Sequence, residues 1–194
     1  MQPRTYHNPV NGEYTSILKS SFETNGDYTH FEVSLTPGGG NPVHYHTGFT
    51  EEFTAVKGLL GLQLGKKIIY LKPGETALVP VYSRHRFFND TNDTIIFRVR
   101  LVKGQPGFEN FLKAIFGLVN DRKTITGNQI PKNIYHLAIV YKWGDTHLTN
   151  PLIKLCAPIL NLLYKRAVNL GIEQQLLQRY CSSECIDPDH PGIK

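Results

Sequence analysis

The sequence predicts an all-β core, closed into a barrel, followed by an α-helical extension. Short apolar runs punctuated by glycines recur as far as residue 102, and several alternate between apolar and polar positions. Beyond Gly104 the apolar residues instead recur at spacings of three and four. Alternation is typical of half-buried strands, and the longer spacing is typical of amphipathic helices. We therefore expect a barrel domain at residues 1–105 and a helical extension at residues 106–194.

The predicted strands follow one another closely along the chain. The side chains of Phe31, Val33 and Leu35 alternate with polar ones and therefore share one face of a strand. The run at 94–102 is rich in β-branched residues, which favour strands. In chain order we expect a strand at 28–36, a hairpin at 59–64 and 67–71, turns at 72–75 and 89–93, and a closing strand at 94–102.

Three segments of the extension have patterns that predict helices. Residues 107–121 place five apolar side chains on one helical face: Phe108, Phe111, Leu112, Ile115 and Leu118. Residues 134–147 are so apolar that their periodicity allows a helix or a strand, and we favour a helix. A third helix is expected to begin at Pro151, because proline is well tolerated in a first turn, and to kink at Pro158.

The third predicted helix presents a broad apolar arc beside a narrow polar line. The polar line consists of Lys154, Asn161, Lys165 and Asn169. The arc consists of Leu152, Leu155, Ile159, Leu163 and Val168. It agrees with packing against the barrel wall or a partner subunit, with peripheral contact to a membrane surface, or with a lid over the barrel mouth. We favour packing.

The composition is that of an ordinary globular protein, with 194 residues, 40% hydrophobic and 19% charged. The net charge of +5 comes from basic residues spread along the chain, so we expect no nucleic-acid partner. Few cysteines, namely Cys156, Cys181 and Cys185, favour a reduced, cytoplasmic compartment over a disulfide scaffold. The first ten residues lack the apolar segment of a signal peptide, and no apolar run reaches the ~18 residues of a membrane span.

Two segments carry the side chains of a divalent-metal site. His44 and His46 are two residues apart in a predicted strand, so both point to the same face. Glu51 or Glu52 follows on the next strand, where the two should face opposite sides, and His85 comes from a later strand. Imidazole and carboxylate groups bind Zn²⁺, Fe²⁺, Mn²⁺, Ni²⁺ or Cu²⁺, so the residue types leave the metal open.

The spacing of these residues resembles the two sequence motifs of the cupin family. The first motif is Gly38, five residues, His44, one residue, His46, four residues, Glu51, six residues and Gly58. The second is Gly74, five residues, Pro80, four residues, His85, three residues and Asn89. One position departs from the pattern: Tyr82 stands where the second motif usually has a glycine, which would permit a positive φ.

The resemblance covers roughly residues 25–105 and extends more loosely to the start of the chain, which looks like the first strand of small bacterial single-domain cupins of the RmlC-like type. The chain resembles these proteins also in carrying a helical tail after the barrel. It implies a double-stranded β-helix, or jelly-roll barrel, with a metal ion held inside near one mouth. The ligands that it implies are His44, His46, Glu51 and His85. Cupin barrels commonly pair, so the resemblance also implies a homodimer.

Side chains that share faces with these ligands are expected to line a pocket for a small, partly hydrophobic organic molecule. They are Phe53 and Ala55 beside Glu51, and Phe87 and Asn89 beside His85. Asn89 also fits the turn that ends its strand, and we favour that interpretation slightly.

Two classes of function agree with such a site. One is a metal-dependent enzyme, such as a dioxygenase or an isomerase, and the other is a non-catalytic module that binds or senses a small molecule. The set of four ligands favours the enzyme modestly. The sequence offers no evident general acid or base beyond those ligands, which weakens this interpretation.

Overall fold

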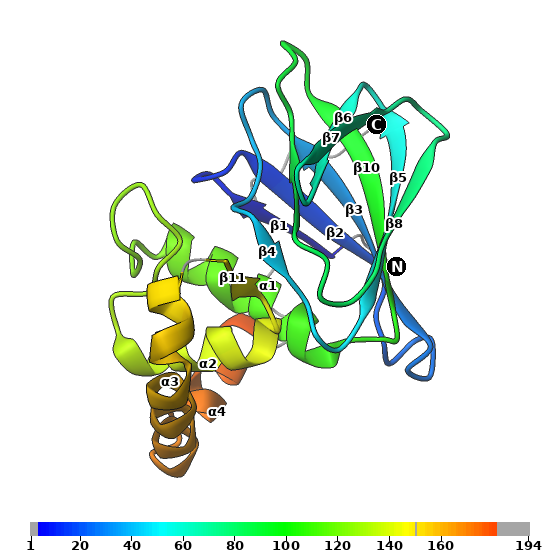
Figure 1. The fold of residues 1–194 in the computed structure, drawn as a ribbon. Helices are drawn as coiled ribbons and strands as arrows, with labels where there is room; N and C mark the ends of the chain where they lie inside the picture. Colours follow the sequence, from blue (N-terminus) through cyan, green and yellow to red (C-terminus); the bar gives the residue numbers. More distant parts are fainter. Residues whose placement is uncertain (1–3, 150, 182–194) are drawn as a thin grey trace.

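The computed structural model describes residues 4–149 and 151–181. Two antiparallel sheets face each other to form a jelly-roll core, and the helices gather to one side of it (Figure 1). The first sheet has the order β1 (Arg4–Asn8), β2 (Glu13–Lys19), β3 (Tyr28–Leu35), β10 (Ile95–Val102), β5 (Thr50–Lys57), β8 (Thr76–Val79). The second has the order β11 (His147–Leu148), β4 (His44–Tyr45), β9 (His85–Phe88), β6 (Leu60–Leu64), β7 (Lys67–Leu71). The predicted all-β core with helices after it is confirmed.

The interior of the jelly roll is filled by the alternate residues of its strands. In β3, the side chains of Phe31, Val33 and Leu35 are buried, as their alternation predicts. The ring of Phe97 in β10 packs between two others, with centroids 5.1 Å from Phe87 and 6.3 Å from Phe53. These aromatic contacts join the two sheets, since Phe87 belongs to β9 and the other two rings belong to the first sheet.

In the described part of the chain, five helical segments follow β10. They are α1 (Pro106–Asn120), α2 (Ile134–Gly144), α3 (Pro151–Asn169), α4 (Ile172–Leu176) and the π-helical turn η1 (Leu177–Cys181). The helices predicted near 107–121 and 134–147 are therefore present, although the second ends at Gly144 and the chain then forms β11. The helices share a second apolar core whose buried members include Leu118, Ile139 and Ala167.

Helix α3 buries a different side from the one its apolar arc indicates. Leu160 and Ala167 are buried, and Ala167 belongs to the core shared with the other helices, whereas Leu155 is 76% exposed and Ile159 is 59% exposed. Within the described residues α3 packs mainly on α2, so the barrel wall does not cover the arc, and the other form of the favoured prediction, packing against a partner subunit, stays a prediction. The side chains of Leu152 and Lys154 lie outside the described part, as does Cys185.

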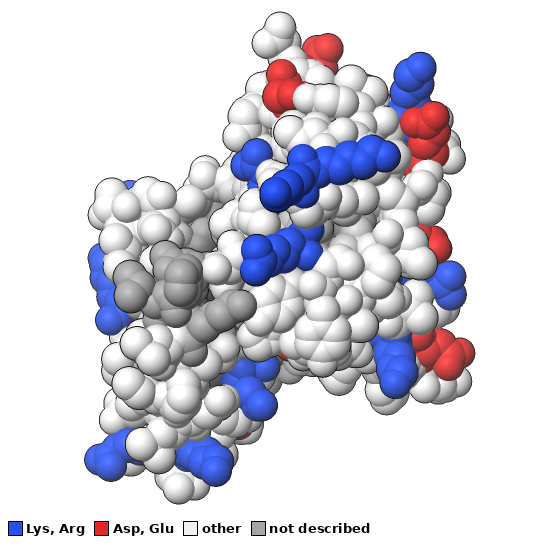
Figure 2. All heavy atoms as spheres, in the orientation of Figure 1, with Lys and Arg blue, Asp and Glu red and all other residues white. Residues whose placement is uncertain are grey.

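Charged side chains are dispersed over the molecular surface. In Figure 2, lysines and arginines lie in several separate groups on the visible face, with acidic side chains among those of the barrel. No helix in the described part of the chain is long and apolar enough to cross a bilayer. The expectation that no nucleic acid binds stays a prediction.

Tyr82 confirms that the turn before β9 requires a positive φ. Its φ is +63°, the left-handed region that glycine occupies at the corresponding motif position, and its side chain is 67% exposed. The backbone N–H of Tyr82 donates to the carbonyl oxygen of His46 at 2.7 Å, so the turn lies directly beside a candidate ligand.

We expect Tyr82→Gly to raise the free energy of unfolding by about 1 kcal/mol, because a Cβ is strained at this φ. Tyr82→Ala is the matched control, since it removes the ring but keeps the Cβ. Urea unfolding of both variants measures the difference. Equal stability of the glycine and alanine variants would show that the backbone here is not strained.

Candidate metal centre

Four polar side chains converge inside the barrel from three strands and a loop. His44 lies in β4, directly opposite His85 of β9, and Glu51 lies in β5. His46 follows β4 on the same face as His44, while Tyr45 between them points away. All four are buried, with exposed fractions of 5% for His44, 3% for His46, 5% for Glu51 and 1% for His85.

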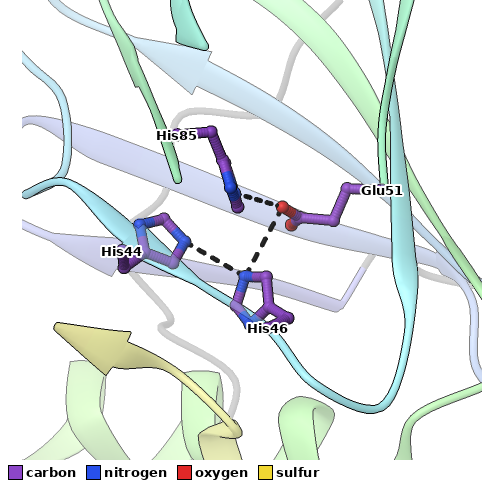
Figure 3. Close-up of side chains that lie close together, drawn as sticks. All are labelled: His44, His46, Glu51 and His85. Atoms are coloured by element: carbon purple, nitrogen blue, oxygen red, sulfur yellow. Dashed lines mark hydrogen bonds and ion pairs between the residues drawn. The ribbon is translucent and has the colours of Figure 1, made fainter. Parts of the chain in front are cut away.

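The candidate ligand atoms of these residues lie close enough to share one ion. One atom from each side chain falls within 4.8 Å of all the others. The Nε2 atoms of His44 and His46 are 3.0 Å apart, and Glu51 Oε2 lies 2.5 Å from His85 Nε2 and 3.4 Å from His46 Nε2 (Figure 3). Two ligands on opposite sides of one ion lie roughly 4.2 Å apart, at about 2.1 Å each from the metal. The cluster matches this scale.

A hydrogen bond at Nδ1 orients each of the three imidazole rings. The Nδ1 atoms of His44, His46 and His85 each lie 2.9 Å from a backbone carbonyl oxygen, of Pro42, Asp145 and Ser83 respectively. A carbonyl only accepts, so each Nδ1 carries the proton and each Nε2 directs a lone pair toward the cluster. This arrangement of the second nitrogen is typical of metal-ligating histidines.

Several of these atoms lack an ordinary hydrogen bond. With both Nδ1 atoms protonated, no proton lies between the Nε2 atoms of His44 and His46. Glu51 Oε2 and His85 Nε2 are close, but their angles are not those of a hydrogen bond, and neither has a partner among the described residues. Buried polar groups are normally satisfied, and a cation within the cluster would satisfy all four. The donor set therefore fits a divalent ion.

The charge states of His44 and Glu51 also suit a cation. Burial, together with the neighbouring His46 and His85, lowers the pKa of His44 to about 3, so its imidazole is neutral at pH 7. Burial alone would raise the pKa of Glu51, but His46 and His85 beside it lower that pKa, so the group is a carboxylate. Burial opposes a charge on His85, but its contact with Glu51 raises the pKa of His85.

Comparison with known proteins agrees with this geometry. A family profile described as "Cupin domain" matches residues 31–100, a segment that contains all four clustered side chains. Residues 31–100 of this chain therefore form a cupin domain. No curated protein matches the sequence significantly.

Solved structures that resemble part of this chain share little sequence with it. The polyketide cyclase RemF from Streptomyces resistomycificus is 21% identical, with a TM-score of 0.48, over 54% of this chain and 77% of that one. A predicted oxalate decarboxylase from Thermotoga maritima is 18% identical, with a TM-score of 0.47, over 52% and 91%. An RmlC-like cupin from Shewanella frigidimarina is 17% identical, with a TM-score of 0.48, over 55% and 89%.

A cavity of about 530 Å³ adjoins the cluster, and it is lined mainly by apolar side chains. Phe53 and Phe87 line it, as does Glu51. Ala55 is buried in the apolar core and is not among the lining residues in the described part of the chain. Asn89 does not line it either. Its side chain bonds the carbonyl oxygens of Leu35 and Asp93 at 3.0 and 2.8 Å, so it holds the turn after β9.

The helical extension contributes a residue that the sequence did not reveal as part of the site. Asp145 follows α2 in the left-handed conformation, and its carbonyl oxygen accepts the bond from His46 Nδ1. Its carboxylate accepts bonds from the backbone N–H groups of Thr47 and Gly48 at 2.8 and 2.7 Å, and from the Thr47 hydroxyl at 2.7 Å. Burial would raise the pKa of Asp145, but these bonds lower it.

The two residues of β11 extend the same contact. His147 and Leu148 pair with Tyr45 and His44, which adds a strand from the extension to the edge of the second sheet. The extension is thus joined to the loop that carries His46 by side chains and by the sheet. The Gly-Asp pair at the end of the helical pattern indicates where the helix ends, but nothing nearby in the sequence indicates that Asp145 contacts the loop of His46.

Proposed function

We propose that this cupin binds one divalent metal ion through His44, His46, Glu51 and His85. The observation that carries the proposal is the common direction of three Nε2 lone pairs and one carboxylate toward a single point, with every Nδ1 held by a carbonyl oxygen. Fe²⁺, Mn²⁺, Ni²⁺, Zn²⁺ and Cu²⁺ all accept this donor set.

We further propose that the bound ion holds a small organic molecule in the adjoining cavity. His44 and Glu51 line this cavity together with the rings of Phe53 and Phe87. The apolar wall would exclude water from the ligand, and the polar groups near the cluster would fix its orientation. Four protein ligands on an octahedral ion leave two positions for other molecules.

The reaction class that we infer is that of a metal-dependent dioxygenase or isomerase. A divalent ion would supply Lewis-acid polarisation of a substrate oxygen, or electron transfer to dioxygen if the metal is redox-active. The residues of the chain hold the ligand nitrogens in one tautomer, keep Glu51 charged and surround the substrate with aromatic rings. The alternative function is a module that holds the same molecule without changing it.

Metal analysis followed by an activity screen tests this proposal. The protein is purified without added metal, its metal content is measured, and samples loaded with Fe²⁺, Mn²⁺ or Ni²⁺ are screened for oxygen uptake with flavonol, diketone and thiol substrates. We expect about one ion per chain and turnover of at least one substrate. One ion per chain without turnover would favour the binding module, and no stoichiometric ion would contradict the proposed centre.

Asp145 provides a test of how the extension supports the centre. We expect Asp145→Ala to weaken metal binding by about 10- to 100-fold, because the loop of His46 loses the bonds that position it. Asp27→Ala is the control, since Asp27 is exposed in the turn before β3. Metal affinities are measured by competition with a chelator, and melting curves establish that both variants fold. An unchanged affinity in folded Asp145→Ala would show that the bonds do not orient His46.

We also propose that residues 106–194 act as an extension that closes this end of the barrel. A homodimer and a cytoplasmic location are further proposals. The exposed side of α3 with Leu155 and Ile159 is a surface on which pairing or peripheral membrane contact would occur.

A further inference from the structure

A second polar group lines the cavity away from the proposed metal centre. Four lining side chains are both polar and buried: His44, Glu51, Glu13 and Thr15. The first two belong to the metal centre. Glu13 and Thr15 point inward from β2 and are only 6% and 1% exposed, and they form a separate pair that the proposed chemistry does not use.

The contacts of Glu13 leave hydrogen-bonding capacity for a ligand. Its Oε1 accepts from the Thr15 hydroxyl at 2.6 Å, and its Oε2 accepts from Asn11 Nδ2 at 2.7 Å. Asn11 also lines the cavity, and its buried Oδ1 has no hydrogen-bond partner among the described residues. We refer to Asn11, Glu13 and Thr15 as the Glu13 group. It presents one unused acceptor beside a buried carboxyl.

The surroundings of the Glu13 carboxyl favour its neutral, protonated form. Burial raises the pKa of Glu13, although the bonds from Thr15 and Asn11 oppose this effect. Within residues 4–149 and 151–181, no lysine, arginine or histidine forms an ion pair with it. A protonated carboxyl can donate a hydrogen bond, and a group that accepts this bond while donating to Asn11 Oδ1 is a hydroxyl.

The strand register places the Glu13 group far along the barrel from the metal centre. Glu13 lies opposite Leu35 of β3. Glu51 lies opposite Leu101 of β10, which in turn lies opposite Thr29 of β3. Leu35 and Thr29 are six residues apart, or about 20 Å of strand.

The wall between the two polar ends of the cavity is apolar. Phe31 and Val33 of β3 and Val99 of β10 line this part of the cavity. A molecule that reached from the metal centre to the Glu13 group would therefore be extended and apolar in its middle.

We propose that the Glu13 group is a second anchor that binds a terminal hydroxyl of an extended, mostly apolar ligand, whose other end lies at the metal centre. This inference rests on the proposed function only in placing one end of the ligand at the metal centre. It assigns the ligand class as a long molecule with an oxygen ligand for the metal at one end and a hydroxyl at the other.

A length series of simple probes tests the anchor. The protein loaded with Co²⁺ is titrated with linear ω-hydroxy carboxylates of about six to about sixteen carbon atoms, and with methyl-terminated carboxylates of the same lengths. The Co²⁺ absorption spectrum reports binding at the metal. At the matching length we expect the hydroxyl-terminated probe to bind about tenfold more tightly. A third series, of ω-amino carboxylates of the same lengths, tests whether the group at this end prefers a cation. Equal affinity of hydroxyl- and methyl-terminated probes at every length, or tighter binding of the ω-amino series, would overturn the proposal.

Variants test whether the preference for the hydroxyl-terminated probe comes from the Glu13 group. We expect Glu13→Leu to abolish the tenfold preference, Glu13→Gln to retain part of it, and Glu52→Gln on the outer face of β5 to leave it unchanged. If Glu13→Leu does not fold, Asn11→Ala replaces it with the same expected loss. A preference that survives in the folded variant overturns the proposal.

The affinity for Co²⁺ alone, measured before any carboxylate is added, separates the two claims. A protein that does not bind Co²⁺ contradicts the metal centre. A protein that binds Co²⁺ but shows no hydroxyl preference contradicts only the second anchor.

Discussion

Replacing His44 and His46 together by alanine is expected to lower metal affinity by more than about 100-fold, to below stoichiometric binding, while the barrel stays folded. The double variant removes two of the four donors and leaves Glu51 and His85 unable to complete the coordination of the ion. Strand β4 has only two residues, so the sheets depend little on it. Metal content by elemental analysis and the melting curve of the purified variant measure the two parts of this expectation.

The control for this experiment is the double variant His30→Ala and His136→Ala. His30 lies on the outer face of β3 and His136 lies in α2, so neither belongs to the cluster. This control variant should bind metal as the original protein does. Full metal occupancy in the folded His44→Ala/His46→Ala variant would mean that other side chains are the ligands.

The largest effect on stability is expected from Phe97→Ala. Phe97 is completely buried in β10, where its ring packs against Phe53 and Phe87 and joins the two sheets. Deleting a buried ring removes its burial and leaves a cavity, which costs about 3–5 kcal/mol in the free energy of unfolding. Urea unfolding measures this change.

Val102→Ala is the matched control for Phe97→Ala, because Val102 lies in the same strand and is 40% exposed. It should change the free energy of unfolding by less than about 0.5 kcal/mol. A cost below about 1 kcal/mol for Phe97→Ala would contradict the role of this ring in joining the sheets.

The four candidate ligands could be named from the sequence because their spacing resembles the two cupin motifs, and strand alternation agrees with that choice. Strand alternation places His44 and His46 on one face and separates Glu51 from Glu52, and the structure agrees, with Glu51 buried and Glu52 half-buried on the other face. Alternation also placed Asn89 inside, but its amide is used by the turn, as the favoured interpretation held.

Contacts between distant parts of the chain could not be predicted in this way. Strand β11 has two residues, too few for a periodic pattern, and its pairing with β4 joins segments about a hundred residues apart. Asp145 was missed for the same reason. Helix α3 is apolar on more than one side, so periodicity could not distinguish the buried side with Leu160 and Ala167 from the exposed side with Leu155.

The most direct test of the metal centre is a crystal structure of the metal-loaded protein with anomalous diffraction data collected at the absorption edge of the metal. We predict one anomalous peak, about 2.0–2.3 Å from Nε2 of His44, His46 and His85 and from a carboxylate oxygen of Glu51. A loaded crystal with no peak among these atoms, or with its peak at other side chains, would contradict the central claim.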